Sequence, residues 1–163
     1  MKKIIGILFL TAIVFASCSK KSFELQNATS KRFGGGTILS GTGIVYTFEL
    51  KAFQSQENLK IDTVYIRNRS FQNFSIHKKG AKPGEDLHYE KGDIIIVTVT
   101  HSKRPLISDG HPPKIIDGEF KENGLPSSRN LNGAEALLIV KVKDKFIEIP
   151  VQKFTVLEPE MRP

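Results

Sequence analysis

The chain has 163 residues, a formal net charge of +7 and one cysteine. Its length fits a single domain, and the lone cysteine excludes an intrachain disulfide, so an apolar core must hold the fold. The basic residues are scattered and form no long run beside aromatic side chains, which excludes the usual pattern of a nucleic-acid-binding protein.

Residues 1–17 have the three parts of a secretory signal peptide. Two lysines are followed by an apolar stretch from Ile4 to Phe15, and the small residues Ala16 and Ser17 end the segment. The apolar stretch is shorter than the roughly 20 residues that a membrane-spanning helix needs. Removing this segment takes away two lysines and no acidic residue, which leaves 146 residues with a net charge of +5.

The run Val-Phe-Ala-Ser-Cys that ends at Cys18 resembles a bacterial lipobox, and the whole N-terminus resembles that of a bacterial lipoprotein precursor. The resemblance implies that Cys18 becomes the lipidated first residue of the mature protein. An aspartate after the cysteine favours inner-membrane retention in lipoproteins, so Ser19 implies the outer membrane. Lys20 and Lys21 differ from the acidic cluster of some surface-displayed lipoproteins. We therefore expect a protein of the bacterial cell envelope, anchored to the outer membrane and facing the periplasm.

Residues 18–32 are polar and are predicted to form a tether, with an edge strand at 23–26, before a domain at 33–163. The glycine-rich segment 34–43 has two glycines at the spacing of a phosphate-binding loop, but Thr42 stands where that loop needs a lysine. We interpret this segment as a flexible connection into a strand.

Alternating apolar residues predict the strands that follow. A change of phase after Ile61 indicates a bulge, and Pro150 places its strand at a sheet edge because it lacks a backbone donor. Phe154 to Leu157 are predicted to extend that last strand. The predicted strands cover 44–52, 59–66, 71–77, 94–100, 136–142 and 146–151, with a short one near 114–120.

Short strands, regular turns and no helical period predict an all-β antiparallel β-sandwich. The sandwich would be immunoglobulin-like but would lack the disulfide and the tryptophan of the immunoglobulin core. A small β-barrel is the alternative. The predicted core residues are Val97, Val99, Leu138, Val140, Ile147 and Ile149.

Three long polar segments, 34–43, 78–91 and 101–133, are the candidate binding loops. His101, Asp109 and His111 could supply metal ligands, but their spacing matches no established motif. The neighbouring acids Glu85 and Asp86 lie in a Pro-Gly turn and are interpreted as solvated. The only site residue that we predict is therefore Cys18, with no catalytic, metal-binding or cofactor-binding residue and no cofactor.

The combined pattern predicts a lipid-anchored cell-envelope binding or assembly module without catalytic activity. It would engage the membrane through its lipid and another envelope protein through its loops. A glycan is less suitable, because the chain has no tryptophan and three tyrosines to stack on sugars. The alternative is an envelope hydrolase or metal-binding protein that uses the 101–133 loop.

Overall fold

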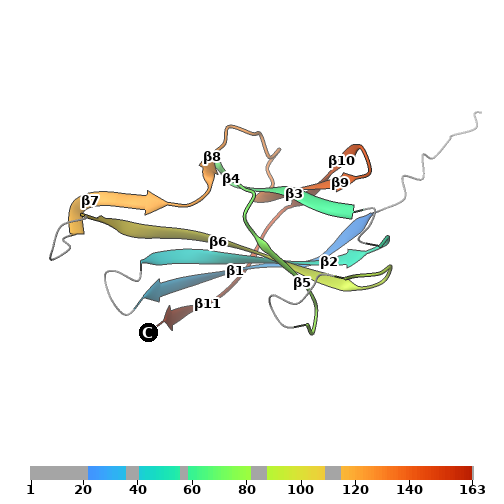
Figure 1. Ribbon diagram of the computed structural model, residues 1–163, viewed down its shortest axis with the longest axis horizontal. Coiled ribbons are helices and arrows are strands. Elements are labelled where there is room, and N and C mark those ends of the chain that lie inside the picture. The colour runs from blue at the N-terminus through green and yellow to red at the C-terminus, as the bar shows by residue number, and fades with distance from the viewer. Residues whose placement is uncertain (1–21, 36–40, 56–58, 82–87, 109–114, 163) are drawn as a thin grey trace, which may run out of the picture.

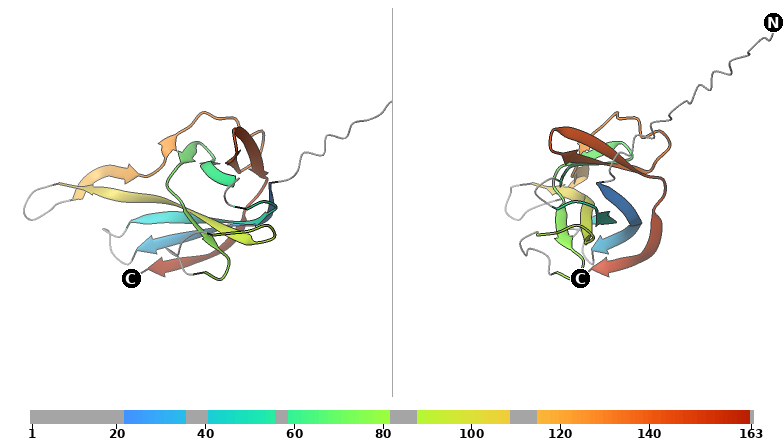
Figure 2. Two further views of the ribbon diagram at one scale, coloured as in Figure 1. Left: turned by 45° about the vertical axis from the view of Figure 1, so that its right-hand side comes forward. Right: turned by 90° about the vertical axis from the view of Figure 1, so that its right-hand side faces the viewer.

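The computed structural model describes residues 22–35, 41–55, 59–81, 88–108 and 115–162. They form two β-sheets that pack face to face, as a β-sandwich (Figures 1 and 2). Neighbouring strands are antiparallel except for one parallel pair. The all-β sandwich prediction is confirmed, whereas the alternative of one closed barrel is not what these strands form. Within these residues no helix is long and apolar enough to cross a membrane.

The larger sheet has six strands in the order β11-β1-β2-β6-β5, with β7 paired to β6. Its strands are β1 (Phe23–Gly35), β2 (Thr42–Ala52), β5 (Ser75–Lys78), β6 (Ile94–Ile107), β7 (Ile115–Glu122) and β11 (Thr155–Arg162).

The smaller sheet has five strands in the order β10-β9-β3-β4-β8. The register of its strand β3 shifts between Ile61 and Thr63, and Pro150 lies on the edge strand β10, so the predicted bulge and edge are both confirmed. Its strands are β3 (Leu59–Ile66), β4 (Arg69–Phe71), β8 (Leu125–Pro126), β9 (Ala136–Val142) and β10 (Lys145–Val151).

The core lies between the sheets, where alternate residues of β2, β6, β3 and β9 point inward. Four of the six predicted core residues are fully buried, and Ile149 is partly buried against the core. The four are Val97, Val99, Leu138 and Val140. The prediction for Ile147 is wrong, because this side chain is 36% exposed. It lies on β10, which has a neighbouring strand on one side only.

Strand β1 begins at Phe23, so the strand predicted at 23–26 is confirmed, and the predicted tether is wrong from Asn27 to Arg32. This strand is not at an edge but lies between β11 and β2. Among its side chains only Phe23 and Ala28 are buried, so its sequence has no clear alternation of apolar and polar residues. Backbone hydrogen bonds on both sides can hold such a polar strand in place, since they satisfy its donors and acceptors.

Two segments change sheet where the sequence predicted continuous strands. The segment 71–77 is split, because β4 belongs to the smaller sheet and β5 to the larger one. Likewise 154–157 does not extend β10, because Thr155 begins β11 in the larger sheet. Phe154 anchors this crossing in the core, with ring centroids 5.0 Å from Tyr46 and 5.6 Å from Phe48.

The segment 101–133 is not one long loop. Strand β6 continues to Ile107 and pairs with β7, and this β6–β7 hairpin extends beyond the smaller sheet (Figure 1). The part after β8 packs on the outer face of the smaller sheet, where Arg129 pairs with Glu148 and its guanidinium lies 5.1 Å from the Tyr65 ring centroid. Among the described residues, the loop prediction holds for 123–124 and 127–133, whereas 109–114 lie outside the described residues.

Candidate functional site

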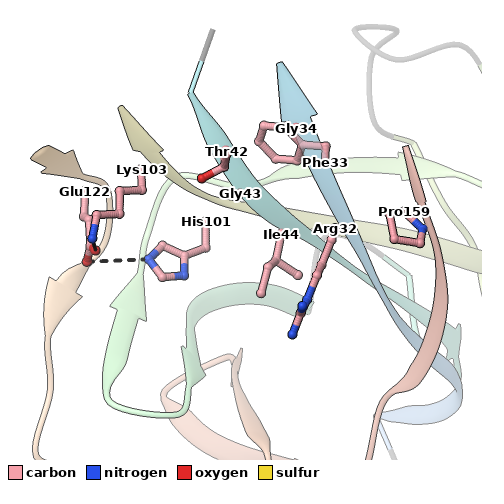
Figure 3. Close-up of a pocket in the computed structure, with 10 residues that line it drawn as sticks. All are labelled: Arg32, Phe33, Gly34, Thr42, Gly43, Ile44, His101, Lys103, Glu122 and Pro159. Carbon is pink, nitrogen blue, oxygen red and sulfur yellow. Dashed lines mark ion pairs between the residues drawn. The ribbon is translucent and has the colours of Figure 1, made fainter. Parts of the chain in front are cut away.

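The inner face of the larger sheet continues past the core. Strands β1, β2 and β6 have 13, 11 and 14 residues, whereas β3, β9 and β10 have 8, 7 and 7. In the uncovered part, Ile44 pairs with Arg32 on one side and His101 on the other. Because directly paired residues share a face, these three side chains lie in one row across three strands (Figure 3).

A pocket of about 410 Å³ opens at this end of the sheet. The next row along the strands also lines it, with Gly34, Thr42 and Lys103 in register. Glu122 of β7 and Pro159 of β11 close its sides (Figure 3). The pocket thus combines apolar walls with positive charges at its rim.

Glu122 is the centre of a small network of charged side chains. Its carboxylate accepts a hydrogen bond from Arg69 of β4, and it lies 3.7 Å from the Lys103 ammonium nitrogen. Arg69 also donates to the Gly124 carbonyl oxygen at 2.9 Å. Because Arg69 belongs to the smaller sheet and Glu122 to the β6–β7 hairpin, this network holds the two sheets together at the pocket.

His101 stands beside this network and is partly buried. Its Nε2 atom lies 3.9 Å from a Glu122 oxygen, too far for a hydrogen bond, and its ring packs edge-on against Phe71 with centroids 5.8 Å apart. Burial lowers the pKa of His101, and the Arg69 charge lowers it further, while Glu122 opposes both. His101 is therefore neutral at neutral pH.

The lowered pKa of His101 predicts that the wild type and a His101→Gln variant differ in their stability at acidic pH. Its folded-state pKa lies below the unfolded value of about 6.5, so its contribution to stability is present above that value and is lost as pH falls through the folded pKa. His101→Gln cannot titrate and should lose less stability on acidification than the wild type. Urea unfolding at neutral pH and at a pH well below about 6.5 measures this. Equal losses in both proteins would contradict it.

Two positions beside the pocket must be glycine, because neighbouring atoms leave no room for a Cβ atom. A Cβ atom on Gly43 would lie 2.4 Å from the His101 carbonyl oxygen and 2.5 Å from the Phe33 ring. Gly41 has a φ of +70°, which favours glycine, and a Cβ there would lie 2.7 Å from the Lys103 carbonyl oxygen. These contacts account for both glycines without a bound phosphate.

The structure brings two of the three predicted binding segments together. Residues of 34–43 and of 101–133 line the same pocket, whereas the described parts of 78–91 lie at the opposite end of the larger sheet. Of the candidate metal ligands, His101 is in the pocket, and Asp109 and His111 lie outside the described residues. So do Cys18, Glu85 and Asp86.

No group of three or more His, Cys, Asp or Glu side chains that could hold a metal ion occurs in the part of the chain that the structure describes. The positive neighbours of His101, Arg69 above all, also oppose a cation there. Thr42 supplies the only hydroxyl side chain among the described residues that line the pocket. The arrangement is suited to holding an apolar group beside a negative charge.

Sequence reasoning missed Arg32, Arg69 and Glu122. Each lies in a polar segment with no motif around it. Their importance comes from strand pairing and from the contact between sheets, so no local pattern could have identified them. Comparison with protein-family models, with curated proteins and with solved structures finds no match for this chain.

Proposed function

We propose that this protein is a lipid-anchored binding module of the bacterial cell envelope. In this proposal Cys18 carries the anchor in the outer membrane, and the pocket with its β6–β7 hairpin binds a segment of another envelope protein. The observation that carries the proposal is the position of the pocket at the end of the sandwich opposite to the end where β1 begins (Figure 1).

The length of β1 sets the separation of these two ends. Phe23 pairs with Ala52 at one end of the sheet, and Arg32 pairs with Ile44 at the other. Nine residues of extended strand cover about 30 Å. A domain attached through Cys18, just before β1, can therefore hold its pocket away from its own membrane and toward a partner.

The charges at the pocket indicate the chemistry of that partner. Arg32 and Arg104 are exposed, and the Lys103 side chain is 50% exposed. The carboxylate of Glu122 is already engaged by Arg69. A protein segment that carries an apolar side chain next to carboxylates would complement this surface. A glycan is disfavoured because Tyr46 and Tyr89 are buried and offer no stacking platform.

Charge reversal at the pocket rim tests this function. The double variant Arg32→Glu and Lys103→Glu should weaken partner capture about tenfold, because each exposed ion pair contributes up to about 1 kcal/mol. The measurement is the amount of partner that each variant captures from detergent-solubilised envelope extracts and holds after cross-linking. Lys153→Glu is the matched control, since Lys153 is exposed outside the pocket. Equal capture by both variants would place the partner surface elsewhere.

The metal-binding or hydrolytic alternative can be separated on the same protein. It requires a metal ion bound in stoichiometric amount, which is lost in His101→Ala and in His111→Ala. Elemental analysis of the purified protein distinguishes the two functions, because the binding module needs no metal.

A further inference from the structure

The turn of the β9–β10 hairpin lies at the same end of the molecule as the start of β1. Leu59 at the start of β3 pairs with Val142 at the end of β9, and β3 follows β2, whose last residue Ala52 pairs with Phe23. Both views of the ribbon agree, since the hairpin turn and the first residues of β1 lie at one end (Figures 1 and 2).

This hairpin turn is basic and carries an exposed aromatic side chain. Lys141, Lys143 and Lys145 occupy alternate positions, Phe146 follows directly, and Asp144 is the only acid in the segment 141–146. Phe146 is 61% exposed, and the Lys141 ammonium nitrogen lies 6.0 Å from its ring centroid. The exposed lysines are Lys141, Lys143 and Lys145, with Lys60 opposite Lys141 on β3.

Lys143 occupies a position that favours glycine. Its φ is +52°, in the left-handed region that side chains with a Cβ adopt at a cost. Glycine or asparagine would turn the chain here with less strain. A strained residue held in a turn suggests that its side chain has a role there, and the Lys143 side chain contributes positive charge at the outermost point of the hairpin.

We infer that the tip of the β9–β10 hairpin binds the anionic phospholipid surface to which the protein is anchored. The inference rests on the proposed anchor at Cys18. Ser22 is the fourth residue after Cys18, and four steps along the chain span at most about 14 Å. This end of the domain is therefore held close to the bilayer, where lysines are attracted to anionic headgroups.

The aromatic ring and the charges fit this surface together. A phenylalanine flanked by lysines can enter the boundary between headgroups and acyl chains while the lysines stay among the phosphates. A second copy of the chain does not fit, because two tips of the same positive charge repel each other. Contact at this tip would fix the orientation of the domain and direct the pocket away from the membrane.

The absence of tryptophan from the sequence makes the contact measurable. Phe146→Trp introduces a single fluorescent reporter at the tip, and Met161→Trp, at a side chain 77% exposed near the opposite end, is the matched control. Both processed proteins are reconstituted into vesicles that contain phosphatidylglycerol and brominated lipid. We expect several-fold stronger quenching at position 146, with a blue shift of its emission. Added salt should reduce this quenching, because it screens the lysines.

A further variant separates charge from folding. Lys143→Gly, combined with Phe146→Trp, removes one positive charge and relieves the strained turn. It should weaken the tip's binding to the vesicles about fivefold, as expected for one lysine at an anionic surface. Its thermal unfolding midpoint should not fall. Quenching that is unchanged by this variant and by salt would overturn the charge-dependent contact.

The anchor and the contact can fail separately. Intact mass of the same preparation reports whether lipid is attached at Cys18. With lipid attached, equal quenching at positions 146 and 161 overturns the hairpin contact and leaves the anchor in place. With no lipid attached, the proposed anchor fails, and the contact is judged by quenching of the unlipidated chain on the same vesicles. Quenching at position 146 there would support it, and none would overturn it.

Discussion

Truncation of Leu138 to alanine is expected to lower the free energy of unfolding by about 2–5 kcal/mol. Leu138 has no exposed surface and lies on β9, where it pairs with Ile149 on one side and Val64 on the other. The loss combines the transfer free energy of the removed carbons with the cavity that the two packed sheets cannot close. Urea unfolding followed by circular dichroism measures it.

Ile147→Ala is the matched control for this experiment. Ile147 pairs with Val140 on the neighbouring strand, but it is 36% exposed on the edge strand β10. Because more than a third of this residue is already exposed, its truncation should cost clearly less than that of Leu138, about 1 kcal/mol. Similar losses for both variants would contradict the burial that the structure assigns to β9 and β10.

Replacement of Cys18 by serine is expected to release the protein from the outer-membrane fraction. A serine hydroxyl cannot take the place of the thiol that would carry the lipid, so the lipidation and processing implied by the lipobox-like segment would stop. Each buried methylene of an acyl chain contributes about 0.8 kcal/mol to membrane binding, and several chains make a durable anchor. Membrane fractionation and immunoblotting of wild type and variant measure the change.

Ser19→Ala serves as the control for Cys18→Ser, because it alters the neighbouring residue and keeps the thiol. This control should remain in the membrane fraction. Intact mass of the native protein gives an independent check. A native protein whose mass shows no added lipid would rule out the anchor, whatever the fractionation shows.

Several strands could be predicted from the sequence because their burial repeats every second residue. In β2 the buried side chains of Tyr46, Phe48 and Leu50 alternate with partly exposed ones, so the apolar pattern in the sequence matches the burial in the structure. The change of phase in β3 and the missing donor of Pro150 are also local properties. They correctly predicted a register shift and an edge strand.

Other features depend on partners that are distant in the chain. The mostly polar β1 is a strand because β11 and β2 flank it, and the segment 71–77 divides because its two ends pair in different sheets. The pocket likewise joins Arg32, His101 and Glu122, which have no common pattern in the sequence. Apolar alternation shows which face of a strand is buried, because it repeats locally. The neighbours of a strand, and the polar residues brought together at its end, are decided by pairing across the whole fold.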